Sequence, residues 1–400
     1  MSASTSCNER ALRLLGGAED EADLARSLAR DGCSDELFRI VVEGLADRFE
    51  PELCDRYARL FSEVIAEVLP EYRAAALQER YWRVRVPHVC TSEPERVYVL
   101  SRVTLGADIA VTSVLLAAAK QRFPRAEIVF VGSAKNAELW AGDERVRYLS
   151  APYPRTGSLG DRLEVGLILR GMIGEPGSVV LDPDSRLTQL GLLPVCEEGR
   201  YFFFESRGYG GQGAEALPEI AGRWCEAVLG VGEVATYLAL PGQLTGHGPA
   251  LQSPALQTTV SFGVGENLAK RVGGAFEAGL LREMRGRILV DCGAGGEEAR
   301  RVEQAILGTQ AETWSGSFAG FVSQIARSSL YVGYDSAGQH AAAALGIPLV
   351  TVFAGHVSQR MFERWKPTGR GPIEVVNAEG LSEKEALRQT TAAIRRIRTL

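Results

Sequence analysis

The sequence lacks the markers of several large classes of protein. Its seven cysteines lie far apart, at positions 7, 33, 54, 90, 196, 225 and 292, and no two form a C-x-x-C pair. This spacing supports neither a disulfide framework nor a zinc site and is typical of a reducing compartment. The first residues show no basic segment followed by an apolar one, so we expect no signal peptide.

Long apolar runs and an excess of charge of one sign are missing as well. The most apolar stretch, residues 109–119, is interrupted by Thr112 and Ser113 and is too short to cross a bilayer. The 400 residues include 44 basic and 50 acidic ones, a net charge of −6, with no long run of either sign. This balance argues against a protein that coats nucleic acid, because such domains are usually basic. We expect a cytoplasmic protein with no nucleic-acid partner.

Lysine is scarce. Only five of the 44 basic residues are lysines, at positions 120, 135, 270, 366 and 384. A lysine inside a glycine-containing loop, as at Lys270, therefore stands out. The apolar fraction of 46% and the charged fraction of 24% are those of a globular protein, and the length predicts two or three domains.

The chain changes its pattern along its length. In residues 8–80, leucine, isoleucine and valine recur every three or four positions between glycine and proline breaks, which predicts short amphipathic helices. From residue 96 onwards, short apolar strands alternate with helices, which is typical of βαβ units and a parallel sheet. The predicted strands are 96–103, 127–132, 146–151, 178–183, 201–206, 258–264, 287–293, 330–336, 348–355 and 372–376.

Two doubly wound parallel-sheet domains of the Rossmann type account for this alternation. The predicted parts are a helical N-terminal extension (1–90), a first α/β domain (91–235), a linker (236–256), a second α/β domain (257–380) and a C-terminal helix (381–400). Ser382 and Glu385 have the spacing of a capping box at the start of that helix. In open α/β sheets ligands bind beyond the carboxyl ends of the strands, so the loops that follow strands are the places for a site.

The loop after strand 330–336 carries the strongest pattern. Asp335, Ser336, Gly338 and His340 open an alanine-rich helix. A strand-to-helix turn of this kind presents backbone N–H groups and the positive helix end to a phosphate, and His340 is placed to reach the same anion. The alternative is that Asp335 or Ser336 only caps the helix.

The loop after strand 258–264 contains Ser261, Gly263 and Lys270 in SFGVGENLAKR. Its glycines permit close approach of the backbone, and Lys270 supplies a point charge for a diphosphate. The spacing is not that of a P-loop. The alternative is a solvated loop with a surface lysine.

Weaker signals follow other strands. Asp108 comes after strand 96–103 and is placed to act as a general base, although its spacing alone favours a helix cap. Arg155, Arg162 and Arg186 offer positive charge to an acidic acceptor. Glu297 opens a helix, where it either binds ribose hydroxyls or stabilises the helix dipole. The motifs of α/β-hydrolases, zinc proteases and nicotinamide enzymes are missing from the sequence.

Taken together, these loops resemble the ADP-heptose lipopolysaccharide heptosyltransferases, glycosyltransferase family 9, over about residues 96–380. Residues 334–346, YDSAGQHAAAALG, resemble the family's Asp-[ST]-Gly-x-x-His-like turn through Asp335, Ser336, Gly338 and His340. SFGVGENLAKR resembles its donor-diphosphate loop, so the resemblance gives that role to Lys270. It also places Glu297 on the donor ribose and Gly316 beside the nucleobase.

The N-terminal half resembles the family at one loop. The family has a Leu-Gly-Asp-x-x-x-Thr sequence whose aspartate is the catalytic base. Residues 105–112 read LGADIAVT, which keeps the spacing from Asp108 to Thr112 but inserts Ala107 before the aspartate.

The resemblance implies a GT-B fold, with two Rossmann-like domains facing across a cleft, and an inverting sugar transfer. Asp108 would deprotonate the acceptor hydroxyl, while Lys270, the helix start and His340 would stabilise the leaving diphosphate in place of a metal. We expect a nucleoside-diphosphate sugar as donor, ADP-linked, and no cofactor or metal.

The expected acceptor is a glycan or glycolipid of the cell envelope. Such an acceptor is compatible with peripheral association of the protein with the inner face of the cell membrane. Residues 1–90 are a candidate binding region for a protein partner. Two alternatives stay open, a sugar-nucleotide epimerase or hydrolase on the same fold and a catalytically degenerate binding or scaffold protein.

Overall fold

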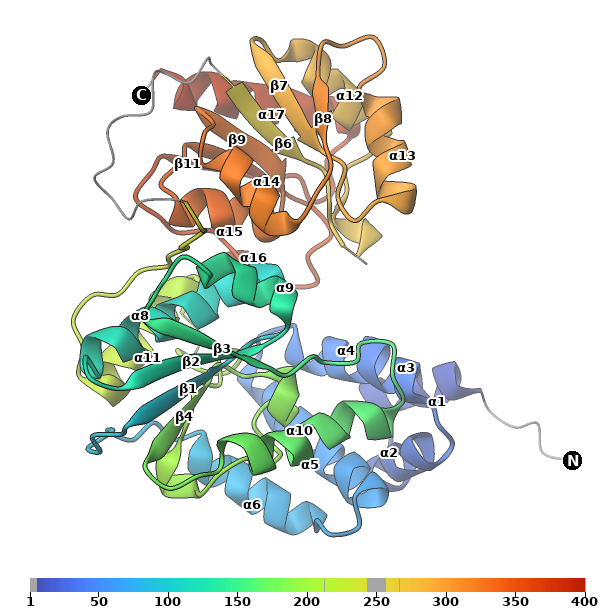
Figure 1. Cartoon of the computed structure of the whole chain (residues 1–400). Coiled ribbons are helices and arrows are strands. Elements are labelled where there is room, and N and C mark those ends of the chain that lie inside the picture. Colours follow the sequence, from blue (N-terminus) through green and yellow to red (C-terminus); the bar gives the residue numbers. More distant parts are fainter. Residues whose placement is uncertain (1–5, 212, 243–256, 266, 400) are drawn as a thin grey trace, which may run out of the picture. The chain divides into compact units, whose positions relative to one another are not determined.

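The computed structural model describes residues 6–211, 213–242, 257–265 and 267–399 (Figure 1). Its contacts divide the chain into two compact units. The first comprises Met1–Thr104, Leu115–Asn136 and Arg145–Val234, and the second comprises Leu105–Val114, Ala137–Glu144 and Ala235–Leu400. Most of the predicted linker 236–256 lies outside the described residues.

The first unit is built on a five-stranded parallel sheet of order β3-β2-β1-β4-β5. Its strands are β1 (Arg96–Leu100), β2 (Glu127–Gly132), β3 (Val146–Ser150), β4 (Ser178–Asp182) and β5 (Tyr201–Phe203). The central strand β1 lies between β2 and β4, with Val97 level with Ile128 on one side and Val179 on the other. Residues 97–100 of β1 are buried on both faces, as the continuous apolar run predicted, and only Arg96 at its start is exposed.

Helices cover both faces of this sheet (Figure 1). On one side lie α8 (Ser113–Arg122) and α11 (Leu217–Leu229). On the other side α10 (Leu159–Ile173), α5 (Pro51–Val68) and α6 (Ala74–Val84) share a core with the sheet. The remaining helices of the N-terminal half are α1 (Cys7–Gly16), α2 (Glu21–Arg30), α3 (Ser34–Glu36), the π-helical η1 (Leu37–Val42), α4 (Glu43–Ala46), α7 (Leu105–Ala107), the π-helical η2 (Asp108–Thr112), α9 (Ala134–Ala137), and the 3-10 turns η3 (Glu138–Trp140), η4 (Arg186–Thr188) and η5 (Glu198–Arg200).

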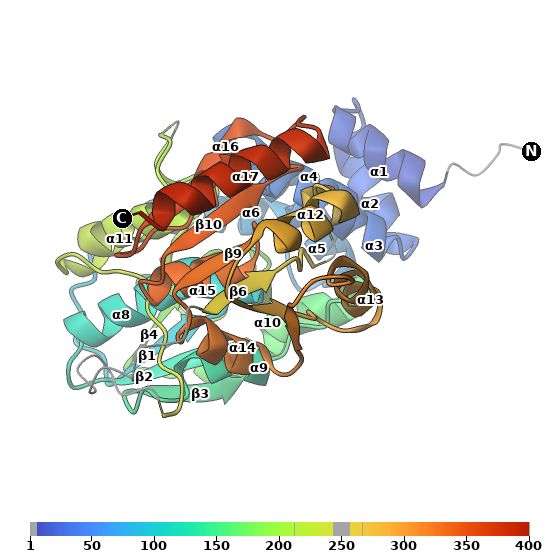
Figure 2. The same cartoon turned by 90° about the horizontal axis from the view of Figure 1, so that it is seen from above.

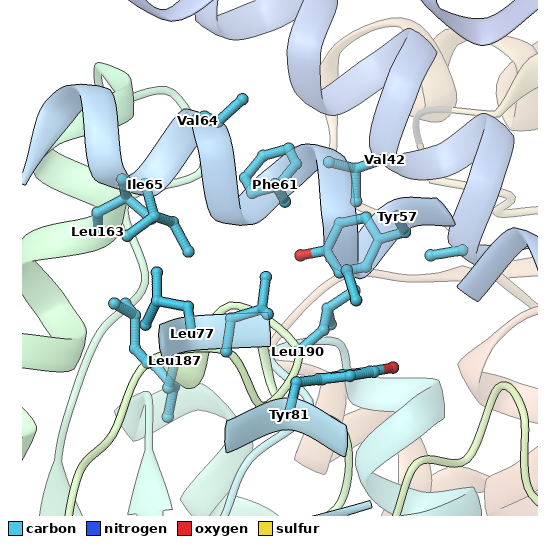
Figure 3. Close-up of a cluster of buried hydrophobic side chains, with 14 of the residues drawn as sticks. Val42, Tyr57, Phe61, Val64, Ile65, Leu77, Tyr81, Leu163, Leu187 and Leu190 are labelled. Atoms are coloured by element: carbon cyan, nitrogen blue, oxygen red, sulfur yellow. The ribbon is translucent and has the colours of Figure 1, made fainter. Parts of the chain in front are cut away.

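The boundary predicted at residue 90 does not separate two units. Phe61 and Ile65 of α5 pack with Leu77 of α6, Leu163 of α10 and Leu187 of η4 in one continuous cluster (Figure 3). The helices of residues 7–84 therefore complete the core on one face of the sheet. Helical periodicity identified these helices but did not show what their apolar faces cover, because that depends on contacts distant in sequence.

Polar contacts tie the same helices to the sheet. The Tyr57 hydroxyl of α5 donates to the Gln189 carbonyl at 3.2 Å and accepts from the Gln189 side-chain amide at 2.9 Å. Arg80 of α6 donates to the Gly191 carbonyl at 2.6 Å, and its guanidinium lies 4.6 Å from the centre of the Tyr201 ring. Buried hydrogen bonds of this kind are typical of one unit rather than of a detachable appendage.

One disulfide forms, contrary to the expectation from cysteine spacing. Cys7 and Cys33 are joined, with their Cα atoms 5.6 Å apart. The pair becomes possible because α1 and α2 pack against each other and return the chain to the start of α1. The other five cysteines, at 54, 90, 196, 225 and 292, are free.

The second unit contains a six-stranded parallel sheet of order β11-β10-β9-β6-β7-β8. The strands are β6 (Gln257–Ser261), β7 (Arg287–Asp291), β8 (Glu312–Trp314), β9 (Leu330–Tyr334), β10 (Leu349–Phe353) and β11 (Ile373–Asn377). Besides α7, η2 and η3, its other elements are η6 (Leu268–Lys270), α12 (Gly274–Glu283), α13 (Gly296–Ala305), α14 (Phe318–Ile325), α15 (Ala337–Ala344), α16 (Gln359–Arg364) and α17 (Glu383–Ile397). Helices α12, α13 and α17 share the core of one face, and α14 and α15 lie on the other (Figure 2). The short elements β8 and α16 were not predicted from the sequence.

The C-terminal helix α17 belongs to this second unit, where it buries Ala386, Ala393 and Ile394 in the core of the sheet. Ser382 caps its start, as predicted, by accepting a hydrogen bond from the Glu385 backbone N–H at 3.3 Å. The capping box is only half formed, because the Glu385 carboxylate binds Arg388 at 2.6 Å instead of returning to the cap.

Candidate functional site

The ends of β6 and β9, neighbours in the second sheet, bring two predicted site residues together. Lys270 ends the 3-10 turn η6 that follows β6, and Asp335 directly follows β9. The Lys270 Nζ donates to Asp335 Oδ2 at 2.6 Å, although the two residues are 65 positions apart. Their side chains are 18% and 7% exposed, so the lysine side chain is largely shielded although residues 267–269 of its loop are exposed.

Asp335 is held from its other side by a residue that sequence reasoning missed. The Gln339 side-chain amide donates to Asp335 Oδ1 at 2.6 Å, and Gln339 Oε1 accepts from the Thr351 hydroxyl at 2.6 Å. Gln339 and Thr351 are fully buried. The relay Thr351–Gln339–Asp335 therefore orients the carboxylate that holds the Lys270 ammonium. The i, i+4 spacing of Asp335 and Gln339 on a helix start was the signal available in the sequence.

The start of α15 is not capped by a side chain in the way the alternative interpretation required. Ser336 stands at the N-cap position in extended backbone, but its side chain makes no capping hydrogen bond. The first N–H groups of an α-helix have no partner within the helix, and they carry its positive dipole end. This end of α15 follows Asp335 directly and so adjoins the lysine pair.

His340 lies in the interior of the unit. It is 3% exposed, its ring centre is 5.8 Å from that of Trp365, and Gln339 Nε2 is 3.3 Å from its Nε2. Burial lowers the pKa of His340 to about 4, so the imidazole is neutral at pH 7. It acts as a hydrogen-bonding group and not as a cation.

Gly338 has a packing reason of its own. A Cβ at this position would lie 2.1 Å from the Tyr331 hydroxyl, and one at Gly333 would lie 2.5 Å from it. The Tyr331 ring, which is fully buried, therefore requires both glycines. The glycine in this turn reflects the fit of α15 onto β9.

Ser261 and Gly263 line the end of β6 beside β7. The Ser261 hydroxyl donates to Asp291 Oδ2 at 3.3 Å, and the Gly263 N–H donates to Ser261 Oγ at 3.4 Å. Burial raises the pKa of Asp291. A Cβ at Gly263 would lie 2.8 Å from Glu298 Oε1, so this loop runs close to the start of α13.

Two neighbouring acids at the start of α13 differ in their surroundings. Glu297 has a side chain 60% exposed, and it pairs with Arg300 at 2.8 Å and with Arg301 at 3.3 Å. Glu298 instead accepts a hydrogen bond from the Ala294 N–H at 2.8 Å, and its carboxylate approaches Gly263. Sequence reasoning selected Glu297, whereas the geometry places Glu298 at the strand ends.

Gly316 follows β8 and packs on the indole of Trp314. A Cβ at Gly316 would lie 2.9 Å from that ring. The Trp314 indole N–H is buried and has no hydrogen-bond partner among the described residues. Trp314 was not singled out from the sequence.

Asp108 lies inside a continuous helical stretch that begins at Leu105, so it is not the helix cap that its spacing favoured. It is fully buried, and the Thr112 hydroxyl donates to Asp108 Oδ1 at 2.6 Å. The turn Asp108–Thr112 is π-helical. A π-turn holds one residue more than an α-turn, which is how a helix accommodates an inserted residue such as Ala107.

The three arginines expected on the acceptor side lie in the first unit but differ in their contacts. Arg162 is buried and donates to the Gly157 carbonyl at 3.0 Å and to the Arg155 carbonyl, so it holds the loop after β3. Arg155 is exposed and donates to the Val103 carbonyl at 3.3 Å. Arg186 is partly buried, and its Nη1 has no hydrogen-bond partner among the described residues. Arg186 is thus the one with an unused buried donor.

Neither a metal cluster nor a membrane span is found in the described part of the chain. Among those residues no three His, Cys, Asp or Glu side chains gather closely enough to hold a metal ion. None of their helices combines the length and apolar character needed to cross a bilayer.

Comparison with known proteins supports the fold. No family model and no curated protein matches the sequence. A glycosyl transferase family 9 structure from Veillonella parvula is similar to this chain with a TM-score of 0.56 at 13% identity, covering 78% of this chain and 99% of that one. The E. coli heptosyltransferase WaaC, solved with ADP-2-deoxy-2-fluoro heptose, gives a TM-score of 0.51 at 16% identity, covering 75% and 98%. The chain therefore has the two-domain α/β fold called GT-B, as predicted.

Proposed function

We propose that this chain is an inverting, metal-independent glycosyltransferase that moves a heptose-like sugar from a nucleoside diphosphate to a glycan of the cell envelope. The observation that carries the proposal is the Lys270–Asp335 pair beside the start of α15, on a fold shared with glycosyltransferases. The similar E. coli protein was solved with ADP, which supports an ADP-linked donor.

In this proposal the diphosphate binds at the ends of β6 and β9. Lys270 turns from Asp335 to the diphosphate, while the relay through Gln339 keeps Asp335 in place to position the ammonium. The N–H groups at the start of α15 supply further donors to the anion. Positive charge fixed in advance stabilises the leaving group as its bond to the sugar breaks.

The chemical step needs a base for the acceptor hydroxyl, and we assign Asp108 to it. The hydroxyl proton passes to the Asp108 carboxylate while the oxygen forms a bond to the anomeric carbon. The bond from that carbon to the diphosphate breaks, and its electron pair leaves with the phosphate oxygen. Attack opposite the leaving group inverts the anomeric configuration. The Thr112 hydroxyl fixes the carboxylate orientation.

The acceptor side is assigned to the first unit, where the loops after β3 and β4 carry Arg155 and Arg186. Ligands of α/β sheets bind at this edge. Two arginines there favour an acceptor with a phosphate or carboxylate group. We place the reaction in the cytoplasm, with peripheral attachment at the inner face of the cell membrane.

Mass spectrometry tests the function. The full chain is incubated with ADP-, UDP- and GDP-sugars, with and without envelope glycan acceptors. The expected result is a glycosylated acceptor and free nucleoside diphosphate, formed from an ADP-sugar and unchanged by EDTA. The Lys384→Ala variant, which removes a lysine from the exposed surface of α17, is the matched control for Lys270→Ala. Nucleotide release or epimer formation without acceptor would replace this proposal with the epimerase or hydrolase alternative.

A further inference from the structure

Two buried hydrogen-bond donors at the ligand edge of the first sheet have no partner among the described residues. They are the Tyr153 hydroxyl, in the loop after β3, and Arg186 Nη1, in the turn after β4. Contacts link the loops that carry the two groups: Arg186 and Arg162 both lie over the Phe38 ring, and Arg162 donates to the carbonyl of Arg155, two residues after Tyr153. Native proteins rarely leave buried donors unpaired, so each of these two donors needs a partner that the described residues do not supply.

The ring of Phe38, from the N-terminal helices, lies close to Arg162 and at the outer limit of a cation–π contact with Arg186. Phe38 lies with its ring centre 5.9 Å from the Arg186 guanidinium carbon and 4.2 Å from that of Arg162. Phe38 is 7% exposed. A guanidinium over an aromatic face is held by the ring quadrupole while its N–H groups stay free to bind in the ring plane.

The helical stretch that carries Phe38 is fixed to the arginine loop at further points. The Ser34 hydroxyl of α3 accepts a hydrogen bond from the Leu159 N–H at the start of α10, at 2.9 Å. Asp35 accepts from Arg162 Nη2 at 3.3 Å. Phe38 itself lies in the π-helical turn η1, a type of turn that is frequent at functional sites.

We propose that the N-terminal helices form one wall of the acceptor site and that Phe38 is the positioning residue of Arg186. In this arrangement Arg186 and the Tyr153 hydroxyl receive an anionic group of the acceptor, a phosphate or a carboxylate. Only the statement that the ligand is the acceptor rests on the proposed function. The anion site and its dependence on Phe38 are testable by binding measurements that need no sugar transfer.

The first experiment measures binding of three probes to the full chain by ligand-observed NMR: glucose 6-phosphate, glucuronate and uncharged glucose. Binding of either anion with no binding of glucose supports the site, and the stronger anion identifies the group. Arg186→Gln should abolish that binding. Absence of anion binding to the wild type, or unchanged binding to Arg186→Gln, would overturn the proposal.

The second experiment separates positioning from stability. Phe38→Leu keeps the apolar bulk but removes the ring, and it should weaken anion binding about three- to tenfold, the range expected for loss of a partly buried cation–π contact. Phe38→Tyr keeps the ring and should restore binding. Val64→Ala is the control, because Val64 is a buried residue of the same helical core (Figure 3). Equal binding loss in Phe38→Leu and Val64→Ala would show a purely structural role.

Transfer, where it is observed, adds a third readout. Phe38→Leu should raise the KM for the acceptor and leave kcat and ADP affinity unchanged. An unchanged acceptor KM in Phe38→Leu, with transfer intact, overturns this inference and leaves the proposed function standing. If the chain binds the anions in a Phe38-dependent way but shows no transferase activity, the anion site stands and the proposed function fails. The failure of the inference and the failure of the proposed function are therefore distinguishable.

Discussion

Replacing Lys270 with alanine should weaken ADP binding much more than replacing its partner. A hydrogen bond to a charged group contributes about 1.5–3 kcal/mol, so loss of the ammonium should raise the ADP dissociation constant about 10- to 100-fold. Asp335→Asn keeps the ammonium and removes the carboxylate that competes with the diphosphate for it. We expect its ADP affinity to stay within about threefold of the wild type. Loss of the competing carboxylate strengthens ADP binding, whereas the Lys270 ammonium is no longer held in position, which weakens it.

Folding stability should fall more in Lys270→Ala than in Asp335→Asn, because Lys270→Ala leaves the more buried of the two partners without its opposite charge. At 2.6 Å the pair has a gross Coulomb energy of about 6 kcal/mol at an effective dielectric constant near 20, most of which is offset by desolvation. Lys270→Ala leaves the 7% exposed Asp335 carboxylate with Gln339 as its remaining side-chain donor among the described residues and should cost about 2–3 kcal/mol. Asp335→Asn leaves a lysine that reaches water and should cost less.

Isothermal titration with ADP and urea unfolding measure both effects. The double variant Lys270→Ala/Asp335→Asn should recover most of the stability lost in Lys270→Ala, since no unpaired charge remains. Lys384→Ala, which removes a positive charge from the exposed surface of α17, is the control for net charge. ADP affinity within twofold of the wild type in Lys270→Ala, or equal loss in Lys384→Ala, would refute the assignment of Lys270 to the diphosphate.

Four further expectations concern other parts of the chain. Asp108→Asn should reduce transfer about 100- to 10,000-fold with ADP affinity unchanged, which single-turnover kinetics would show; retained turnover would exclude it as the base. Removing residues 1–90 should unfold the first unit instead of leaving a nucleotide-binding protein, because it strips one face of the sheet, and circular dichroism would detect a fold that survives. Burial raises the pKa of Glu205 from 4.5 to about 7, so between pH 4.5 and 7 the folded state binds more protons than the unfolded state. The free energy of unfolding should therefore fall as pH rises through this range, and Glu205→Gln should reduce that dependence in urea unfolding. Replacing Cys7 and Cys33 with serine opens a link between residues 26 apart and should cost about 3 kcal/mol, and an unchanged unfolding midpoint in reducing agent would contradict that value.

The inserted residue before Asp108 shows how local structure can absorb a departure from a pattern. The sequence showed only that Ala107 separates Gly106 from the aspartate. The structure places a π-turn at Asp108–Thr112, which takes up one residue and keeps Thr112 hydrogen-bonded to the aspartate. A π-turn has no reliable sequence signal, because it differs from an α-turn by one residue of register and by little in composition.

The two glutamates at the start of α13 show where sequence reasoning reaches its limit. Both suit the helix dipole and both follow a glycine-rich turn, so spacing could not separate them. In the folded chain Glu297 faces Arg300 and Arg301, and Glu298 faces the turn and Gly263. Adjacent residues on a helix point about 100° apart, and only the packing of the helix decides which of them meets the neighbouring strand end.

The sequence by itself determined the alternation of strands and helices, the two parallel sheets and the loops in which Lys270 and Asp335 lie. These depend on apolar periodicity and on the turn residues at strand ends, which act within a few positions of the chain. Only the tertiary structure decided that Lys270 meets Asp335 across 65 residues, that Cys7 joins Cys33, and that the N-terminal helices complete the first core. Each of these contacts depends on how distant segments pack, and packing is not encoded in the spacing of neighbouring residues.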